Sequence, residues 1–298
     1  MKYNPKIGII GGSGVYSFPG LKDVNEINID TPFGKPSSPI LFGKLNEKGI
    51  AFLVRHGLNH SIPPSRVNYR ANIFALKLLG VKWIISISAC GSLREDYAPG
   101  DIVVPNQIFD FTKQRKRSFF DDDVVAHIDV ANPFCEILRQ KIIDGIKLTS
   151  AMVHETGTTI TIEGPRFSTF AESELFRKWG MSIINMTASP EAFLAREAEI
   201  CYAIMNHITD YDVWRINEQS VNVDQIINVL KKNIELTYES IGNAIEFLDP
   251  DDNCLSENAL ESALVTNPDS IDFQKNCLSS IISKYKNSFK WGAYWKND

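Results

Sequence analysis

The sequence predicts a single α/β domain, in which helices flank a twisted, mixed but largely parallel β-sheet. The 298 residues suffice for one large α/β domain, and 44% apolar with 22% charged residues is ordinary for a globular protein. Short apolar runs alternate with stretches of helical length, and these stretches stop at glycine. Such alternation favours parallel strands with helices covering both faces of the sheet.

In the first half of the chain we expect a strand, a hairpin, one helix and a further strand. The apolar run KIGIIGG at residues 6–12 reads as a strand closed by glycines. Alternating apolar residues over 39–57 indicate a hairpin pair. A helix follows, with Ser65 as its N-cap and Gly80 as its stop, and it leads into the strand WIISISAC at 83–90.

The same order recurs in the second half. The helix STFAESELFRKWG at 168–180 leads into the strand MSIINMT at 181–187. Ser189 then caps a helix that has Pro190 at its first position, and the strand ICYAIMNHITD at 200–210 follows. Ligands bind outside the carboxyl ends of the strands in such sheets, and these ends are polar here.

The composition shifts near residue 250, where an acidic, turn-rich stretch begins. We therefore expect a catalytic domain over residues 1–250 and a C-terminal extension over 251–298, packed on the domain or on a neighbouring subunit. The last segment, SKYKNSFKWGAYWKND, interleaves lysines with aromatic residues. A nucleic-acid-binding tail would have this pattern, but the acidic chain favours a tail that docks its aromatic residues on protein.

The overall charge and the cysteines exclude several classes of protein. A formal net charge of −5 argues against a nucleic-acid or membrane-surface binder. No apolar stretch reaches the roughly 20 residues that span a bilayer, and the N-terminus does not resemble a signal peptide. We expect a cytoplasmic protein with reduced thiols, because five cysteines without CxxC spacing indicate neither a disulfide framework nor a zinc site: Cys90, Cys135, Cys201, Cys254 and Cys277.

Hydroxyl and basic side chains stand where strands end, and together they indicate a metal-free phosphate site. The glycine-rich turn GGSGVY fails as a dinucleotide fingerprint and as a Walker loop, yet its backbone N–H groups suit an anion. His56 and His60 lack the glutamate of a zinc HExxH pair. The expected phosphate ligands are Ser13, Arg55, His56, Ser88 and Thr187, although Arg55 could instead pair with an acid and the hydroxyls with local backbone.

Two carboxylates follow the last strand, where the segment reads TDYDVW. Asp210 and Asp212 are two residues apart, so an extended chain would point both to one side. A calcium loop is the simple alternative, but the remaining EF-hand ligands are missing. Carboxylates could accept hydrogen bonds from N7–H and the 6-amino group of a purine. Phe167 lies in a Gly-Pro loop and could stack on such a base, unless it belongs to the core.

The combined motifs resemble the 5′-methylthioadenosine phosphorylases of the trimeric purine nucleoside phosphorylase family. These motifs are IIGGSGVY, VRHG, NYRANI, SACGSL, EGPRFSTFAES, PEAFLAREAEICYA and TDYDVW, and they run in order from about residue 5 to 250. The resemblance implies the purine nucleoside phosphorylase fold. It also implies a homotrimer or a dimer of trimers, with no metal or cofactor and inorganic phosphate as co-substrate. The implied reaction cleaves 5′-methylthioadenosine to adenine and 5-methylthioribose 1-phosphate.

The resemblance also implies roles for individual residues. Asp210 would stabilise N7-protonated adenine as the catalytic residue, with Asp212 at the 6-amino group. His127 would reach the 5′ group from a neighbouring subunit. Phe170 departs from the family, which commonly has an arginine there. The phosphate site would add Ala89, and the remaining nucleoside contacts would be Cys90, Gly91, Phe167, Ser168, Asn185, Met186, Val223, Ile226 and Ile227.

Two positions favour a 6-aminopurine over a 6-oxopurine. Relatives that act on 6-oxopurines generally carry asparagine and glutamate where this chain has Asp210 and Ser168. Three alternatives stay open: a broader phosphorylase of adenosine or inosine, a nucleosidase that uses water, and a nucleoside-binding protein without turnover that acts through its C-terminal extension.

Overall fold

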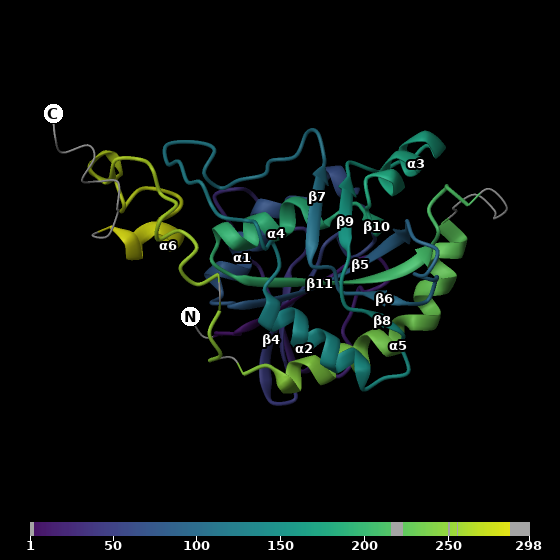
Figure 1. Ribbon diagram of the computed structural model, residues 1–298. Helices are drawn as coiled ribbons and strands as arrows, with labels where there is room; N and C mark the ends of the chain where they lie inside the picture. The colour runs from purple at the N-terminus through teal and green to yellow at the C-terminus, as the bar shows by residue number, and fades with distance from the viewer. Residues whose placement is uncertain (1–2, 216–222, 250, 255, 287–298) are drawn as a thin grey trace.

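The computed structural model describes residues 3–215, 223–249, 251–254 and 256–286. They form an α/β domain around an 11-stranded sheet with helices on both faces, which confirms the expected fold class (Figure 1). The described helices include none that is both long and apolar enough to cross a membrane.

The strands form one mixed sheet in the order β2-β3-β4-β1-β5-β10-β9-β7, and β11 lies between β5 and β6, with β8 beyond β6. The pairings β1–β4, β1–β5, β5–β11, β9–β10, β7–β9 and β6–β8 are parallel. The strands are β1 (Ile7–Gly11), β2 (Lys22–Ile27), β3 (Ile40–Leu45), β4 (Lys48–Val54), β5 (Trp83–Ser92), β6 (Ile102–Val103), β7 (Gln107–Phe111), β8 (Val153–His154), β9 (Thr158–Ile162), β10 (Ile183–Asn185) and β11 (Cys201–Asp210).

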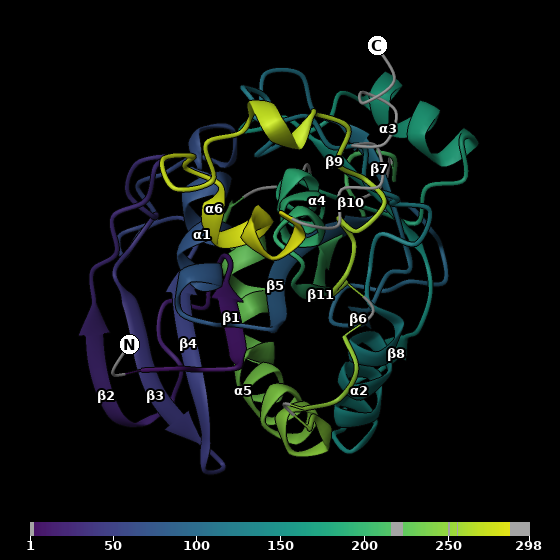
Figure 2. The same cartoon turned by 90° about the vertical axis from the view of Figure 1, so that its left-hand side faces the viewer.

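Helices pack on both faces of this sheet, as Figures 1 and 2 show. The central strand β11 serves both cores because its side chains alternate between faces. Tyr202 and Ile204 pack with the face that carries α1 and α4, whereas Ala203 and Met205 pack with the face that carries α2 and α5. The helices are α1 (Tyr69–Leu78), α2 (Glu136–Lys147), α3 (Phe170–Lys178), α4 (Ala188–Glu197), α5 (Val223–Phe247) and α6 (Ser279–Ile282).

One expected helix start is wrong, a second is confirmed in position but not in its cap, and the glycine stop is confirmed. α1 begins at Tyr69, and Asn68 caps it by accepting a 3.2 Å hydrogen bond from the Ala71 N–H. Ser65 lies in a separate 3-10 turn before the helix. Ser189 has extended backbone at a kink inside α4, but its hydroxyl bonds no described group and therefore does not cap. Gly80 ends α1 with φ +87°, a conformation that favours glycine.

The C-terminal extension packs on its own domain over the described residues 251–286, beside α1 in Figures 1 and 2. Glu199 is one anchor: its carboxylate accepts a 3.2 Å hydrogen bond from the Leu260 N–H and pairs with Lys284 at 2.7 Å. Apolar residues of the extension also join the core cluster of α1 and α4. They are Leu260, Ala263, Leu264, Leu278, Ile281, Ile282 and Tyr285.

A disulfide joins Cys201, at the start of β11, to Cys254 in the extension. The expectation that all five thiols are reduced is therefore wrong for this pair. The two cysteines are 53 residues apart, and only the fold of the extension back onto β11 brings them together. Sequence spacing alone cannot reveal such a pairing.

Candidate active site

A cavity of about 1020 Å³ opens at the carboxyl ends of β5, β10 and β11. The glycine turn after β1, the loop after β4, the loop before α3 and one face of α5 complete its wall. Thirteen of the predicted site residues line it: Ser13, His56, Ser88, Ala89, Cys90, Gly91, Phe167, Ser168, Asn185, Met186, Thr187, Asp210 and Asp212.

Parallel pairing of β5 with β11 brings the strand ends to one place. Ser88 lies opposite Asn206, and Gly91 lies opposite Asp210 after a bulge between Ile208 and Asp210. A bulge changes the direction of the following side chain. Gly91 is needed at this contact, because a Cβ there would stand 3.0 Å from Asp210 Oδ1.

Hydroxyl groups gather at one end of the cavity. Ser88 Oγ and Thr187 Oγ1 lie 3.2 Å apart, although they are 99 residues apart in sequence. Ser13 joins them from the glycine turn after β1. This turn packs tightly, because a Cβ on Gly12 would be 2.3 Å from the Ile87 carbonyl oxygen. Hydroxyls and backbone N–H groups in this arrangement suit an oxyanion.

His56 faces the same end and is held by a backbone contact. Its Nδ1 lies 2.9 Å from the Ile62 carbonyl oxygen, and its ring stacks on His60 with 4.6 Å between centroids. Burial, together with the Arg55 charge, lowers the pKa of His56 to about 4. The imidazole is therefore neutral near pH 7.

Arg55 is not among the described residues that line the cavity. The side chain is fully buried and forms an ion pair with Glu191, with Nε to Oε2 at 2.7 Å and Nη2 to Oε1 at 2.9 Å. It also donates to Ser86 Oγ and the Ile87 carbonyl. Burial acts to lower the pKa of Arg55, but Glu191 outweighs burial and raises it.

The buried ion pair has a structural consequence for the site. Glu191 lies in α4, 136 residues after Arg55, so the pair ties that helix to the end of β4. Nη1 of Arg55 lies directly under the glycine turn, since a Cβ on Gly12 would stand 2.8 Å from it. The role of Arg55 as a direct phosphate ligand stays a prediction.

The two aspartates occupy the other end of the cavity but differ in environment. Asp210 Oδ2 accepts a 2.6 Å hydrogen bond from Thr209 Oγ1, and Oδ1 accepts a 2.8 Å bond from the Asp212 N–H. Asp212 Oδ2 and Ser168 Oγ are buried without a hydrogen-bond partner among the described residues. Burial raises the pKa of Asp212, although the nearby Ser173 and Ser168 hydroxyls oppose this.

The route by which the aspartates converge differs from the one expected. β11 ends at Asp210, and Asp212 has φ +51° in the turn that follows. The two are therefore not successive same-side residues of one extended strand. Both line the cavity because the chain turns back after the strand, and the Asp212 N–H to Asp210 bond closes that turn.

The loop before α3 places an aromatic ring at the cavity wall. Phe167 is 37% exposed, so one face is open to a planar ligand. A capping box between Thr169 and Glu172 begins α3, and Arg166 forms a bidentate ion pair with Glu172 at 2.7 and 2.6 Å. Phe170 is the first residue of α3 and is 48% exposed.

The remaining predicted residues do not enter this description of the cavity. His127 is exposed and is not among the described residues that line the cavity. Its backbone N–H donates to the Ala263 carbonyl at 2.8 Å. Val223, Ile226 and Ile227 fall in the first turns of α5, where the side chains lie outside the described residues.

The structure adds wall residues that the sequence analysis did not assign. Leu230, Lys231 and Ile234 continue α5 by one turn, and helical periodicity from Ile226 could have found them. His60 had been considered only as a partner in a zinc pair. Tyr16 and His60 contact each other at the wall, with Tyr16 Oη 2.8 Å from His60 Nδ1.

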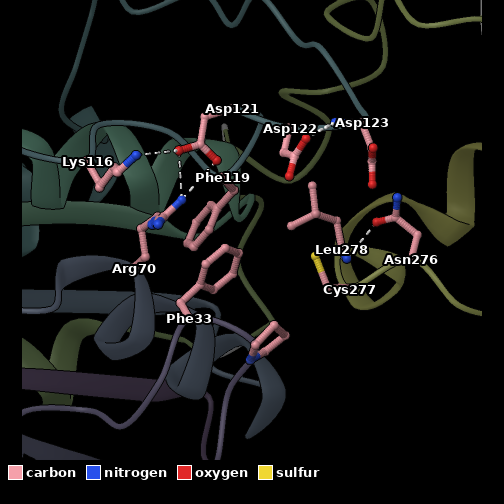
Figure 3. A pocket seen from close by; sticks show the side chains of 11 residues that line it. Phe33, Arg70, Lys116, Phe119, Asp121, Asp122, Asp123, Asn276, Cys277 and Leu278 are labelled. Carbon is pink, nitrogen blue, oxygen red and sulfur yellow. Dashed lines mark hydrogen bonds and ion pairs between the residues drawn. The ribbon is translucent and has the colours of Figure 1, made fainter.

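A second, smaller hollow of about 370 Å³ lies where the 116–123 loop meets the extension (Figure 3). Figure 3 shows Arg70 and Lys116 both reaching Asp121, at 2.9 and 3.7 Å. Its basic groups are therefore already paired with an acid. It also lies apart from the strand ends that carry the predicted residues, so the larger cavity is the candidate active site.

The sequence and the fold are similar to those of known proteins. The sequence pattern of the phosphorylase superfamily matches residues 6–245. The chain belongs to the phosphorylase superfamily. The matched region contains all the described residues that line the cavity. The match confirms the family predicted from the motifs.

Its relatives are consistently named. It is 47% identical to an S-methyl-5′-thioadenosine phosphorylase of Chloroflexus aurantiacus, over 95% of this chain and 99% of that protein. It is 50% identical to the S-methyl-5′-thioadenosine phosphorylase of Hyperthermus butylicus, over 87% of this chain and 95% of that protein. A methylthioadenosine phosphorylase structure from an antarctic soil metagenomic library superposes with TM-score 0.88 at 42% identity, over 93% and 99% of the chains. The structure of a methylthioadenosine phosphorylase from Schistosoma mansoni in complex with adenine superposes with TM-score 0.82 at 38% identity, over 86% of this chain and 97% of that one.

Proposed function

We propose that this phosphorylase cleaves the N-glycosidic bond of 5′-methylthioadenosine with inorganic phosphate, giving adenine and 5-methylthioribose 1-phosphate. One observation carries the proposal: a single cavity has hydroxyls and a neutral imidazole at one end and two aspartates at the other. The names of its relatives support the same reaction. The cavity is large enough for a nucleoside and phosphate together.

The charges of the transition state fit the two ends of the cavity. As the glycosidic bond breaks, the sugar becomes cationic and the leaving purine becomes anionic. A phosphate beside Ser13, Ser88 and Thr187 would stabilise the cationic sugar and then attack its anomeric carbon. A carboxyl group at the other end would stabilise the proton on N7 of the purine.

The aspartates divide the recognition of the base. We assign N7 to Asp210, which is oriented by Thr209 and by the Asp212 N–H. We assign the 6-amino group to Asp212, whose buried Oδ2 is an unused acceptor among the described contacts. A 6-oxopurine would present an acceptor to these acceptors, and this mismatch favours an aminopurine. Phe167 would stack on the ring.

A phosphorylase of both adenosine and methylthioadenosine is the second candidate. Its support is specific: a solved relative from Schistosoma mansoni, 39% identical with TM-score 0.81, is named adenosine/methylthioadenosine phosphorylase. Against it, Leu230 and Ile234 add two apolar side chains to the α5 wall beside Lys231, and apolar contacts prefer a methylthio group to a hydroxyl. Discrimination by such contacts is modest, roughly 10–200-fold.

We further propose a homotrimer, or a dimer of trimers, in which His127 of one subunit reaches the 5′ end of the neighbouring site together with Val223, Ile226 and Ile227. The resemblance to trimeric relatives motivates this assembly. An exposed aromatic surface on β7 and α3 supports association, because large exposed apolar patches mark interfaces. Phe109 and Trp179 contact each other there, with ring centroids 5.7 Å apart, and Phe170 and Leu175 on α3 are also exposed.

We infer a reaction without metal or organic cofactor, in the cytoplasm, with no nucleic-acid or membrane partner. The predicted acidic charge supports the last point.

The test follows the released base after purified protein meets methylthioadenosine, adenosine or inosine, each with and without phosphate; the base is adenine from the first two and hypoxanthine from inosine. We expect phosphate-dependent release of adenine, fastest from methylthioadenosine. Release that ignores phosphate would indicate a nucleosidase, and cleavage of inosine alone would refute the assignment of the aspartates. Binding without turnover would indicate a nucleoside-binding protein.

A further inference from the structure

Arg115 lies in the loop after β7, and its side chain is 1% exposed. A guanidinium has five N–H donors, and all five of Arg115 are used within the chain. Nε donates to Glu163 Oε1 at 3.2 Å, and Nη1 donates to Tyr69 Oη at 3.2 Å and to the Ser189 carbonyl at 2.6 Å. Nη2 donates to the carbonyls of Ile162 and Glu163, at 3.2 and 2.7 Å. Arg115 is not among the described residues that line the cavity, so it acts on the site through these partners.

Most of these bonds meet where β9 ends and the loop before α3 begins. β9 ends at Ile162, and three of the five bonds go to Ile162 and Glu163. The Glu163 carboxylate also returns to the loop of Arg115, since its Oε2 accepts from the N–H groups of Lys113 and Gln114 at 2.5 and 3.1 Å. These contacts fix the start of the loop whose following members line the cavity: Pro165, Phe167 and Ser168.

The remaining two bonds reach other parts of the cavity wall. Tyr69 Oη, which accepts from Arg115, donates to the carbonyl of Pro64 at 3.0 Å, and Pro64 lines the cavity. The Tyr69 ring centroid lies 5.4 Å from the guanidinium carbon, within the range of a cation–π contact. Ser189 follows Thr187, another wall residue, by two positions. One buried cation therefore joins three segments of the wall, and the start of the loop before α3 takes the largest share of its bonds.

The end of this loop nearest α3 is held at the surface. Arg166 pairs with Glu172 there, but the Arg166 side chain is 63% exposed. Exposed ion pairs contribute little, whereas hydrogen bonds to a buried charge contribute more. Phe167 follows Glu163 by four positions, so a shift of Glu163 displaces the ring that would stack on the base. The place of that ring therefore depends on Arg115.

Resting on the proposed function, we propose that Arg115 is a positioning residue for the purine: it fixes the end of β9 and so sets where Phe167 and Ser168 meet the base. Lysine cannot replace it, because an ammonium has its three donors on one nitrogen and cannot reach all of these partners. The phosphate end should change little. Among the described residues, Arg115 makes no hydrogen bond to the segments that carry Ser13 and Ser88.

Isothermal titration calorimetry with adenine and, separately, with sodium phosphate tests this, together with initial rates of adenine release. Arg115→Lys should bind adenine about tenfold more weakly, the size of one aromatic stacking contact, and phosphate within about threefold of the parent. The KM for methylthioadenosine should rise by about tenfold with kcat within about threefold, because the lost contacts bind the base in substrate and transition state alike. A residue that only supported the fold would not separate adenine from phosphate.

Arg139→Lys is the matched control. Arg139 is 4% exposed and donates to backbone carbonyls that do not belong to the described cavity wall, those of Val104, Pro105 and Glu155. The variant should lose stability in urea unfolding, as Arg115→Lys does, but keep the affinity of the parent for adenine and for phosphate.

Glu163→Gln is a milder second variant, because the Glu163 side chain is 21% exposed. Glutamine has one acceptor oxygen, so it cannot accept from Arg115 and from the Lys113 N–H as the two carboxylate oxygens do. Its affinity for adenine should fall by about threefold or more, again without a matching loss for phosphate.

The outcomes separate this inference from the proposed function. Adenine bound by Arg115→Lys as tightly as by the parent, or a loss shared equally with phosphate, would overturn the positioning role and leave phosphorolysis intact. An equal loss of adenine affinity in Arg139→Lys would overturn it too. If Arg115→Lys does not fold, an unchanged adenine affinity in Glu163→Gln overturns it. If the parent neither binds adenine nor releases it from methylthioadenosine, both proposals fall.

Discussion

Replacement of Glu191 by glutamine tests whether the buried ion pair behind the cavity supports the fold. The carboxylate and Arg55 are both fully buried. Glu191 accepts four hydrogen bonds: two from Arg55, at 2.7 and 2.9 Å, one from Ser86 at 2.7 Å and one from Tyr202 at 2.8 Å. Glutamine keeps the shape but leaves the guanidinium charge uncompensated in the interior.

The expected loss follows from that geometry. Breaking a buried ion pair by removing one partner typically costs about 3–5 kcal/mol, because an unpaired charge stays buried. Glu191→Gln should therefore lower the free energy of unfolding by about 3 kcal/mol or more. Tyr202→Phe is the control: it removes a single hydrogen bond to the same carboxylate, and its effect should be about 1 kcal/mol.

The assay is urea unfolding followed by tryptophan fluorescence, with linear extrapolation to zero denaturant. The double variant Arg55→Met with Glu191→Met adds a further check, since removing both charges should be less harmful than removing Glu191 alone. If Glu191→Gln were no more destabilising than Tyr202→Phe, the ion pair would not be a main support of the fold.

Four further predictions address the site and the fold. Asp210→Asn should lower turnover of methylthioadenosine by about 10²–10⁴-fold in the adenine-release assay, typical of losing an acid–base group; a variant as fast as the parent would refute its role. Gly91→Ala places a Cβ 3.0 Å from Asp210 Oδ1 and equally close to Ile184 Cγ2, and it should lower turnover in the same assay by about tenfold or more, because small misplacements of catalytic groups have large effects. Cys254→Ser removes the disulfide to Cys201, which closes a loop of 53 residues. Because the unfolded chain then regains the entropy of that loop, the free energy of unfolding should fall by about 4 kcal/mol. The parent protein with its disulfide reduced should be as stable as the variant. Burial lowers the pKa of His207 to about 4, so as the pH falls the unfolded chain binds a proton at this residue before the folded chain does. The free energy of unfolding should therefore fall by about 3 kcal/mol between pH 6.5 and 4. Urea titrations of His207→Asn at both pH values should lack that part of the loss.

Several parts of the fold could be predicted because they depend on neighbours in sequence. Apolar runs of strand length, such as 200–210, became β11, and Gly80 ended α1 as expected. Strand ends were predicted as the site because parallel strands present their carboxyl ends at one edge. This rule was sufficient to bring Ser88, Thr187 and Asp210 to one cavity.

Other features depend on contacts between distant residues. Arg55 was predicted as a phosphate ligand, but the sequence could not show that Glu191, 136 residues away, holds its guanidinium in a buried ion pair. The Cys201–Cys254 disulfide needs the extension to return to β11. The turn at Asp212 depends on its N–H reaching Asp210, which a period-of-two pattern does not encode.

Sequence alone determined the alternation of strands and helices over residues 65–90 and 168–210, the family and the chemical types of residue at the strand ends, because these depend on local periodicity and short motifs. Tertiary structure decided which of those side chains reach the cavity and which are paired behind it. The physical reason is that burial and pairing set the charge of each group, and both arise only when distant segments pack together.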